Sequence, residues 1–459
     1  MPHIFKKYYP WRTLLFVFGE GLLIFLTINL VVISWIGFSD YKLFLIFYFS
    51  RAVIVSLIFQ LCFYYFDLYD LKIIPALPDH MLKVIQTLGF SCIMLAFIFY
   101  LFPFLVISNK IFWCILLAAS LAIFFWRFFY FKILERRMFV QTIALIGTGV
   151  FAGEIVAAIE KKKDSGFKIV AFVGDKTSSV VPDGVPVFTN IKGLKQLCED
   201  RAIGKIVVAL DEKRGMLLHE LIPYKFLGIE IISGARFYEE ITGTVPVERV
   251  SPSWLVFSEG FYVGRMKKML KRVIDLSAAL SILLVSLPIF LLTALIIKLE
   301  SPGEIFYRQE RVGENGKLFN IIKFRSMVKD AEKNGPVWAA ANDSRITRFG
   351  GFIRKTRIDE LPQLINVLKG DMSFVGPRPE RPVFVKELEE KIPFYSNRHV
   401  VKPGITGWAQ IYYPYGASVE DAIRKLEYDL YYIKNFSIAM DLSTIFRTIK
   451  VVLFHKGAR

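Results

Sequence analysis

The 459-residue chain has few of the side chains that build disulfides, zinc sites and general bases. Its four cysteines form no Cys-x-x-Cys pair and its five histidines are scattered, so the sequence indicates neither a disulfide framework nor a zinc site. The chain also lacks a Tyr-x-x-x-Lys motif, which a short-chain dehydrogenase or a sugar dehydratase would need. Residues 1–11 contain no small-residue cleavage site, so we expect no removable signal peptide.

Apolar residues are abundant instead. They make up 54 % of the chain, well above the average of soluble proteins, and the excess lies in the first third. Four apolar stretches, at about 13–36, 43–66, 81–107 and 111–131, are each near the length of about 20 residues that a bilayer core requires. Arg51 is the one charge that we find well inside a stretch, and we expect it to snorkel or to pack into the bundle.

Basic residues precede the first stretch and gather at the end of the fourth: Lys6, Lys7, Arg12, Arg127, Lys132, Arg136 and Arg137. The positive-inside rule then places both ends of the bundle in the cytoplasm. The net charge of +17 would also suit nucleotides or nucleic acid. Because the chain has no RNA-binding motif or recognition helix, we expect membrane lipids and no nucleic acid as partners.

Strands and helical patterns alternate from about residue 139, with strands expected at 140–146, 168–173, 205–210 and 229–232. This alternation predicts a parallel, doubly wound, Rossmann-like domain. Gly147, Gly149 and Ala152 fit the phosphate-binding turn of such domains, but Asp175 lies later than a ribose-binding acid would. The pattern leaves open whether the domain binds a nucleotide or only serves as a scaffold.

A fifth apolar stretch runs from Leu276 to Ile297 and is long enough to cross a membrane. Pro288 would bend the helix, and basic residues flank both ends. A full crossing would leave residues 298–459 outside the cell, away from nucleotide substrates. We therefore expect a re-entrant helix over about 273–298, bent at Ser286 and Pro288, that enters and leaves the membrane by the same face.

The adjacent carboxylates Asp359 and Glu360 precede an amphipathic helix that has Pro362 in its first turn and Gly370 at its end. An Asp at a helix start is often only a cap. A carboxylate nucleophile that attacks phosphorus, however, needs cations or a metal to neutralise the repulsion. The candidates for such a phosphate clamp are Lys323, Arg325, Arg357 and Arg378.

The last part of the chain contains five motifs between residues 308 and 408. In sequence order they are Arg-Gln-Glu-Arg-Val-Gly, Lys-Phe-Arg-Ser-Met, Asp-Glu-Leu-Pro-Gln-Leu, Val-Gly-Pro-Arg-Pro and Lys-Pro-Gly-Ile-Thr-Gly-Trp. Over about 265–459 the chain resembles the bacterial sugar transferases, the monotopic polyprenol-phosphate phosphoglycosyl transferases. The resemblance implies transfer of a sugar 1-phosphate from a UDP-sugar to undecaprenyl phosphate, with release of UMP and with Mg²⁺. It implies that Asp359 is the covalent nucleophile and that Glu360 helps to hold the metal. It associates the turn of Pro377, Arg378 and Pro379 with UDP-sugar binding.

We predict three parts: a four-helix transmembrane anchor (1–134), a Rossmann-like, CoA-binding-like α/β domain (135–260) and a monotopic α+β catalytic domain (261–459). The resemblance places the protein in the bacterial cytoplasmic membrane, with its catalytic domain on the cytoplasmic face, at the first membrane step of exopolysaccharide, O-antigen or capsule synthesis. Other polysaccharide-assembly proteins and a second copy of the chain are candidate partners.

Two other functions compete with this one. A membrane-anchored nucleotide-sugar dehydratase or epimerase would use the middle domain, but the Tyr-x-x-x-Lys motif is missing. A scaffold or chain-length regulator would not need Asp359 and Glu360 among so many cations.

Overall fold

The computed structural model describes residues 3–4, 7–8, 11–69, 77–106, 109–135, 140–161, 166–175, 180–200, 202–210, 218–328, 345–413, 416 and 418–453. Lys6, Arg136 and Arg137, which enter the expected orientation of the bundle, lie outside these residues. The chain divides into two compact units, Met1–Ile241 and Thr242–Arg459.

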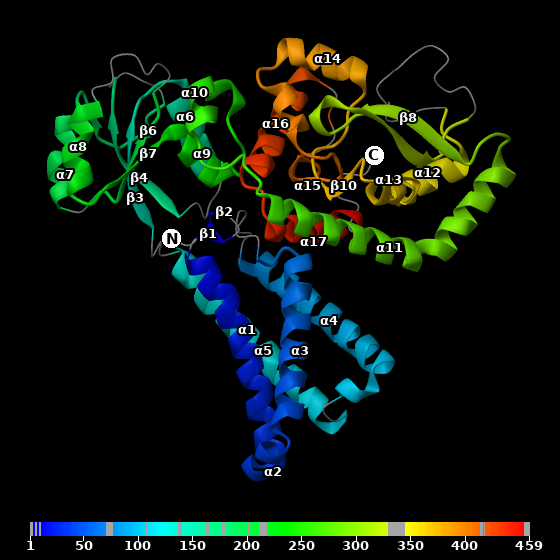
Figure 1. Cartoon of the computed structure of the whole chain (residues 1–459). Helices are drawn as coiled ribbons and strands as arrows, with labels where there is room; N and C mark the ends of the chain where they lie inside the picture. Colours follow the sequence, from blue (N-terminus) through cyan, green and yellow to red (C-terminus); the bar gives the residue numbers. More distant parts are fainter. Residues whose placement is uncertain are drawn as a thin grey trace. The chain divides into compact units, whose positions relative to one another are not determined.

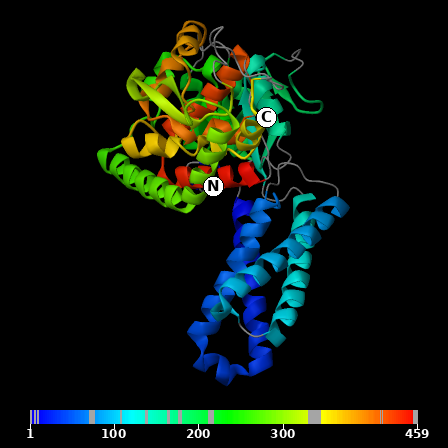
Figure 2. The same ribbon diagram turned by 90° about the vertical axis from the view of Figure 1, so that its right-hand side faces the viewer.

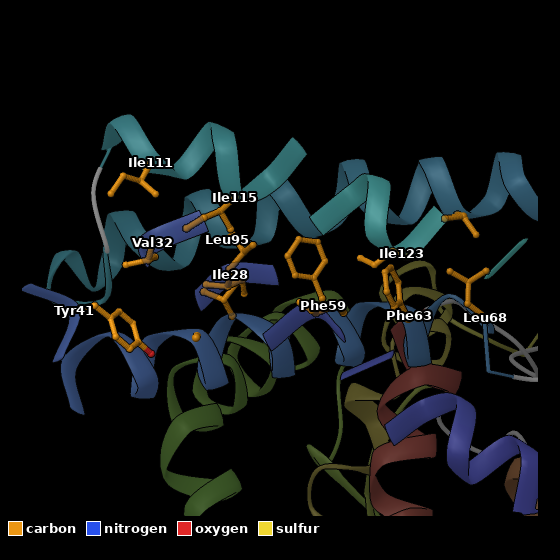
Figure 3. Close-up of a cluster of buried hydrophobic side chains, with 14 residues drawn as sticks. Ile28, Val32, Tyr41, Phe59, Phe63, Leu68, Leu95, Ile111, Ile115 and Ile123 are labelled. Atoms are coloured by element: carbon orange, nitrogen blue, oxygen red, sulfur yellow. The ribbon is translucent and has the colours of Figure 1, made fainter. Parts of the chain in front are cut away.

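Four long helices open the first unit: α1 (Trp11–Ile36), α3 (Leu45–Tyr65), α4 (Leu77–Leu101) and α5 (Asn109–Glu135). By length and composition, each is apolar enough to cross a membrane. All four contribute to one buried cluster, in which Ile28, Phe59, Leu95 and Ile115 point toward one another (Figure 3). The helices match the expected apolar stretches, and their crossing of a bilayer stays a prediction.

A buried ion pair lies inside this bundle, so the expectation that Arg51 is the one internal charge was wrong. Arg127 of α5 binds Glu20 of α1, with Nη2–Oε2 at 2.9 Å and Nε–Oε1 at 2.7 Å, and neither side chain is exposed. Gly19 makes room for this contact, because a Cβ there would lie 2.6 Å from the ring of Trp126. Arg127 is therefore neutralised within the bundle and adds no positive charge to the end of the fourth stretch.

The second part of this unit is a five-stranded parallel sheet with the strand order β5-β4-β3-β6-β7. Its strands are β3 (Gln141–Ile146), β4 (Phe167–Val173), β5 (Val187–Phe188), β6 (Lys205–Val208) and β7 (Glu230–Ser233). Its helices are α6 (Val150–Lys161), α7 (Lys195–Glu199), α8 (Ile222–Phe226) and α9 (Gly234–Thr242). The strand order reverses direction at β3, as in a doubly wound fold. The parallel α/β domain expected from the alternating pattern is confirmed.

The glycine turn after β3 approaches the neighbouring strand closely. Gly147 has a φ of +121°, and a Cβ on it would lie 2.3 Å from the carbonyl oxygen of Ala209. The next residue, Thr148, accepts a hydrogen bond from the backbone N–H of Asp175. Gly147 is thus required by backbone packing at the strand ends, whether or not a phosphate binds there.

The second unit begins with residues 242–261, which we call the strap. The backbone N–H of Val245 donates to the carbonyl of Glu427 (3.0 Å), and that of Phe261 donates to the carbonyl of Lys434 (3.3 Å). The prolines and aromatic residues of 244–264 predict a linker, yet the strap is hydrogen-bonded within the second unit.

The longest element is α11 (Arg265–Glu300), a continuous helix with Pro288 inside it. Figure 1 shows that its axis changes direction toward its C-terminal end. Both of its halves pack on the same unit, with Ala279 in one buried cluster and Ile297 in another. Ser286 bonds only weakly to the preceding turn, 3.5 Å from the carbonyl of Leu283. Whether the helix is re-entrant remains a proposal, taken up below.

The helix runs along one edge of the second unit, and most of the other elements lie on one side of it (Figures 1 and 2). They are the antiparallel hairpin β8 (Phe306–Val312) and β9 (Leu318–Phe324), the parallel pair β10 (Ser373–Val375) and β11 (Gly404–Thr406), and the helices α12 (Arg348–Lys355), α13 (Gln363–Lys369), α14 (Pro382–Lys391), α16 (Val419–Lys434) and α17 (Ile438–Leu453). Asn315 and Gly316 form the turn between β8 and β9, as the Asn-Gly pair predicts, and Ser418 and Asp421 form a capping box at the start of α16.

Candidate active site

Asp359 and Glu360 lie on a tight turn directly before α13. They are part of the 3₁₀ turn η6 (Ile358–Glu360), whereas α13 itself begins after Pro362. Arg357, just before the turn, has a left-handed φ of +60°. The two carboxylates therefore stand at the start of a helix, as expected, and both are buried, at 8 % and 9 % exposure.

Three cations surround Glu360. Lys323 Nζ and Arg378 Nη2 each lie 3.1 Å from its Oε1, and Arg357 Nη1 lies 3.6 Å from the same atom. They come from the end of β9, from the turn after β10, and from the residues before the pair itself. Burial opposes ionisation of Glu360, but the three positive charges outweigh it and hold the pKa of this carboxyl well below its usual range. Glu360 is ionised in the folded protein.

The environment of Asp359 shifts its pKa in the opposite direction. Burial, together with the charge of Glu360 beside it, raises the pKa of Asp359 to about 6. Lys323 and Arg357 lower this pKa, but they offset only part of the rise. Its Oδ1 is buried and has no hydrogen-bond partner among the residues that the structure describes. An oxygen that is poorly solvated, basic and ionised at neutral pH is suited to act as a nucleophile.

Arg325, the fourth candidate for the phosphate clamp, lies at the end of α11 and not with the other three cations. Its Nη2 donates to the carbonyl and hydroxyl oxygens of Ser301, at 2.7 and 2.9 Å, and to the carbonyl of Ile297 at 3.4 Å. Its Nη1 donates to the carbonyl of Pro302 at 3.3 Å. These carbonyls belong to the end of α11, so Arg325 caps that helix, whereas Lys323, Arg357 and Arg378 meet at Glu360.

Two arginines that the sequence did not single out hold the Pro377–Pro379 turn in place. Arg311 Nη1 donates to the carbonyl of Pro379 (3.1 Å), and Arg398 Nη2 donates to the carbonyl of Arg378 (3.1 Å). Arg398 is itself buried against Asp429 at 2.7 Å. Arg311 belongs to the Arg-Gln-Glu-Arg-Val-Gly motif, which could have indicated it, whereas no local signal marks Arg398.

The acid pair fits a magnesium ion of the kind that takes few protein ligands. Within the described part of the chain, no group of three or more His, Cys, Asp or Glu side chains converges. Magnesium usually binds through one or two carboxylates, with phosphates and water filling its other positions. The carboxylate of Glu360 is a suitable oxygen ligand, provided that the substrate supplies phosphate, and Oδ1 of Asp359 is then left free to act as the nucleophile.

Together, the fold and the site indicate the class of protein to which this chain belongs. Long apolar helices are typical of a membrane protein, and a buried acid pair with three cations around Glu360 is an arrangement that suits phosphate esters. Residues 266–455 match the bacterial sugar transferase family, and residues 64–224 match the CoA-binding domain family. The chain belongs to the bacterial sugar transferase family, which confirms the resemblance of its motifs.

Named relatives agree with this assignment. The chain is 45 % identical over 221 residues to the UDP-N-acetylgalactosamine-undecaprenyl-phosphate N-acetylgalactosaminephosphotransferase of Aeromonas hydrophila, covering 48 % of this chain and 52 % of that protein. It is 33 % identical over 330 residues to the undecaprenyl-phosphate glucose phosphotransferase of Komagataeibacter xylinus, covering 70 % and 61 %. An exopolysaccharide production protein of Rhizobium leguminosarum bv. phaseoli is 44 % identical over 191 residues, covering 40 % of this chain and 95 % of that protein. The chain thus spans only 52 % and 61 % of the first two relatives.

Proposed function

We propose that this protein transfers a sugar 1-phosphate from a UDP-sugar to undecaprenyl phosphate, releasing UMP, by way of a phosphosugar bound covalently to Asp359. The observation that carries the proposal is the pairing of a basic, unpartnered carboxylate, Asp359, with a carboxylate held by three cations, Glu360. The names of the first two relatives support undecaprenyl phosphate as the acceptor.

The reaction has two displacements at one phosphorus atom. Asp359 Oδ1 attacks the phosphorus that carries the sugar, and the bond from that phosphorus to the bridging oxygen of UDP breaks, so that UMP leaves. A phosphate oxygen of undecaprenyl phosphate then attacks the same phosphorus, forms the diphosphate linkage and releases the Asp359 carboxylate. Each step exchanges one phosphate linkage for a similar one, so catalysis depends on positioning and charge neutralisation.

The three cations around Glu360 supply this charge neutralisation. Lys323, Arg357 and Arg378 are held at Glu360 before substrate binds, so the electrostatic environment of the phosphates is already organised. A magnesium ion held by Glu360 would neutralise further charge on the diphosphate. The turn of Pro377–Pro379 orients Arg378, which supports its proposed role in binding the UDP-sugar.

The same proposal includes a re-entrant α11 and a cytoplasmic catalytic unit. Near the start of the helix, Arg272 Nη1 donates to the carbonyl of Val367 (2.6 Å), and at its end Arg325 bonds to Ser301. Both ends are therefore attached to one compact unit. A helix that crossed the bilayer fully would have to carry its two ends to opposite faces, about 30 Å apart.

Topology can be tested by labelling in intact cells. In a variant without the native cysteines, Lys317→Cys places a thiol in the exposed hairpin turn between β8 and β9. This thiol should react with a membrane-impermeant reagent only after the cells are opened. Reaction in intact cells would mean that α11 spans the membrane.

The function itself is tested by UMP release from a panel of UDP-sugars with undecaprenyl phosphate. Wild type incubated with the donor alone should gain the mass of one phosphosugar on Asp359, and Asp359→Asn should gain none and should not turn over. A fully active Asn variant would rule out the nucleophile. A tightly bound nicotinamide cofactor in the purified protein would instead favour the dehydratase or epimerase alternative.

A further inference from the structure

Asn366 lies in the middle of α13 and is 1 % exposed. Its side chain reaches β9, where Oδ1 accepts a hydrogen bond from the N–H of Ile322 (3.0 Å) and Nδ2 donates to the carbonyl of Asn320 (2.8 Å). Residues two apart on a strand present their backbone groups on the same edge. The amide therefore pairs with this edge as a neighbouring strand would, and it fixes the position of α13 along β9.

Asn366 also sets the path of the chain after α13. Its carbonyl accepts hydrogen bonds from the N–H groups of Gly370, Asp371 and Met372, at 3.0, 3.1 and 3.3 Å. Its Nδ2 lies 3.3 Å from Oδ2 of Asp371. Met372 directly precedes β10, and β10 leads into the turn that carries Arg378.

Both of the cations nearest Glu360 are thus placed by the same residue. Lys323 follows Ile322 on β9, Arg378 follows β10, and each lies 3.1 Å from Oε1 of Glu360. The apolar contacts between α13 and β9 are non-directional. The hydrogen bonds of the Asn366 amide are directional, so they fix β9 next to Lys323.

We propose that Asn366 is a positioning residue, whose amide holds β9, and with it Lys323, at Glu360 before the substrate binds. This inference rests on the proposed function. A primary amide is suited to the role because it offers a donor and an acceptor at once. An alanine would leave the N–H of Ile322 and the carbonyl of Asn320 without partners inside the protein.

The test compares Asn366→Ala with a matched control, Asn435→Ala. Asn435 is another buried asparagine of the same unit, and its side chain donates a hydrogen bond to the carbonyl of Tyr431. UMP release is measured with each UDP-sugar that wild type accepts. Asn366→Ala should lower kcat by about 100-fold, the effect of a displacement of about 1 Å at a catalytic group. Asn435→Ala should retain kcat within about threefold, because the hydrogen bond to Tyr431 lies at the end of α16, an element that carries neither Lys323 nor Arg378.

A double-mutant cycle separates positioning from a general loss of stability. If Asn366 acts through Lys323, the loss caused by Asn366→Ala should be at least about fivefold smaller in a Lys323→Met background than in wild type. The same loss in both backgrounds, or equal activity of Asn366→Ala and Asn435→Ala, would overturn the proposal. Should the alanine variant fail to fold, Asn366→Ser, which keeps a hydroxyl, serves for the same comparisons.

Hydrogen exchange gives a readout that does not depend on the reaction. Residues 318–324 should exchange faster in Asn366→Ala than in wild type and remain protected in Asn435→Ala. Unchanged exchange in Asn366→Ala would overturn the proposal. If wild type released no UMP from any donor, the proposed function would fail, and the exchange experiment would still decide whether Asn366 fixes β9.

Discussion

At the scale of the residue, Asp359 and Glu360 are neighbours whose environments act on them in opposite directions. Three cations stabilise the Glu360 carboxylate, whereas burial and that same carboxylate destabilise the ionised form of Asp359. Two carboxyl groups with separated pKa values are typical of sites that give them different roles. The arrangement leads to stability predictions of opposite sign.

Asp359→Asn should stabilise the protein at neutral pH. Because the folded pKa of Asp359 is raised from 3.8 to about 6, the native state loses stability as pH rises through this interval, and above it the loss is complete. The loss corresponds to about 3 kcal/mol, which the amide removes. Thermal unfolding should therefore favour the variant at pH 7, with the difference shrinking toward pH 4. A variant less stable than wild type at pH 7 would contradict the assignment.

Glu360→Gln should destabilise the protein instead. It leaves Lys323 and Arg378, whose side chains are 20 % and 35 % exposed, beside a neutral amide. Breaking a fully buried ion pair typically costs about 3–5 kcal/mol, so this partly exposed cluster should lose less, about 1–3 kcal/mol. The folded pKa of Glu360 is depressed, so this stability is present above its ordinary value of 4.5 and is lost as pH falls further. The matched control is Glu387→Gln, whose carboxylate pairs with Lys391 at the surface and should cost at most about 1 kcal/mol. Equal melting temperatures for the two variants would argue against the cation cluster.

The pH dependence of the first displacement follows from the same pKa. The attacking group is the ionised form of Asp359, so phosphosugar formation should rise with pH and reach half its maximum near pH 6. Since Lys323 lowers the pKa of Asp359, Lys323→Met should move this midpoint to higher pH. Rapid-quench measurement of UMP release across pH 5 to 8 tests both statements, and a rate independent of pH would contradict them.

Local patterns in the sequence singled out most of the side chains that the structure brings together at the candidate site. Asp359, Glu360, Arg357 and Arg378 stand within one short stretch whose spacing and turn chemistry are local. The residues that orient them were not predictable in this way. Asn366 and Arg398 bind backbone carbonyls of segments far away in the sequence, and neither differs locally from an ordinary helix or turn residue. Arg325 was assigned to the wrong neighbourhood for the same reason, since the end of α11 reaches it only in the folded chain.

At the scale of the element, prediction succeeded where periodicity and turn residues decide the structure. The parallel strands of the middle domain lie close to where the pattern placed them. The prolines and aromatic residues of the strap are typical of a linker, yet Val245 and Val247 are fully buried in the structure. Burial of that kind depends on which surface the segment meets, and its composition does not reveal this.

Gly147 offers a prediction about the middle domain. Gly147→Ala places a Cβ against the carbonyl of Ala209 at a φ that other residues rarely adopt, so it should lower the stability of the domain by more than about 1 kcal/mol. The control is Gly184→Ala, which also has a positive φ but open space around it, and it should cost about 1 kcal/mol or less. If the domain is a scaffold, both variants should retain donor kinetics at a temperature where they are folded. A selective loss of turnover in folded Gly147→Ala would favour a regulatory nucleotide site.

At the scale of the whole molecule, the second unit contains the acid pair, all three cations that bind Glu360 and both ends of α11. The bundle and the sheet domain contribute none of these groups. Catalysis should therefore be separable from the first unit, provided that the cut falls before the strap.

A fragment that begins at Thr242 should fold and release UMP, whereas one that begins at Tyr262 should be markedly less stable. The shorter fragment loses Val245 and Val247, each worth about 1.5–3 kcal/mol when buried. It also loses the hydrogen bond of the strap to Glu427 of α16, the helix that carries Asp429 and so supports Arg398 behind the Pro377–Pro379 turn. Unfolding in detergent and UMP release, measured on both fragments and the full chain, decide the matter. Equal stability of the two fragments would mean that the strap is only a linker, and a folded but inactive longer fragment would show that the first unit takes part in the reaction.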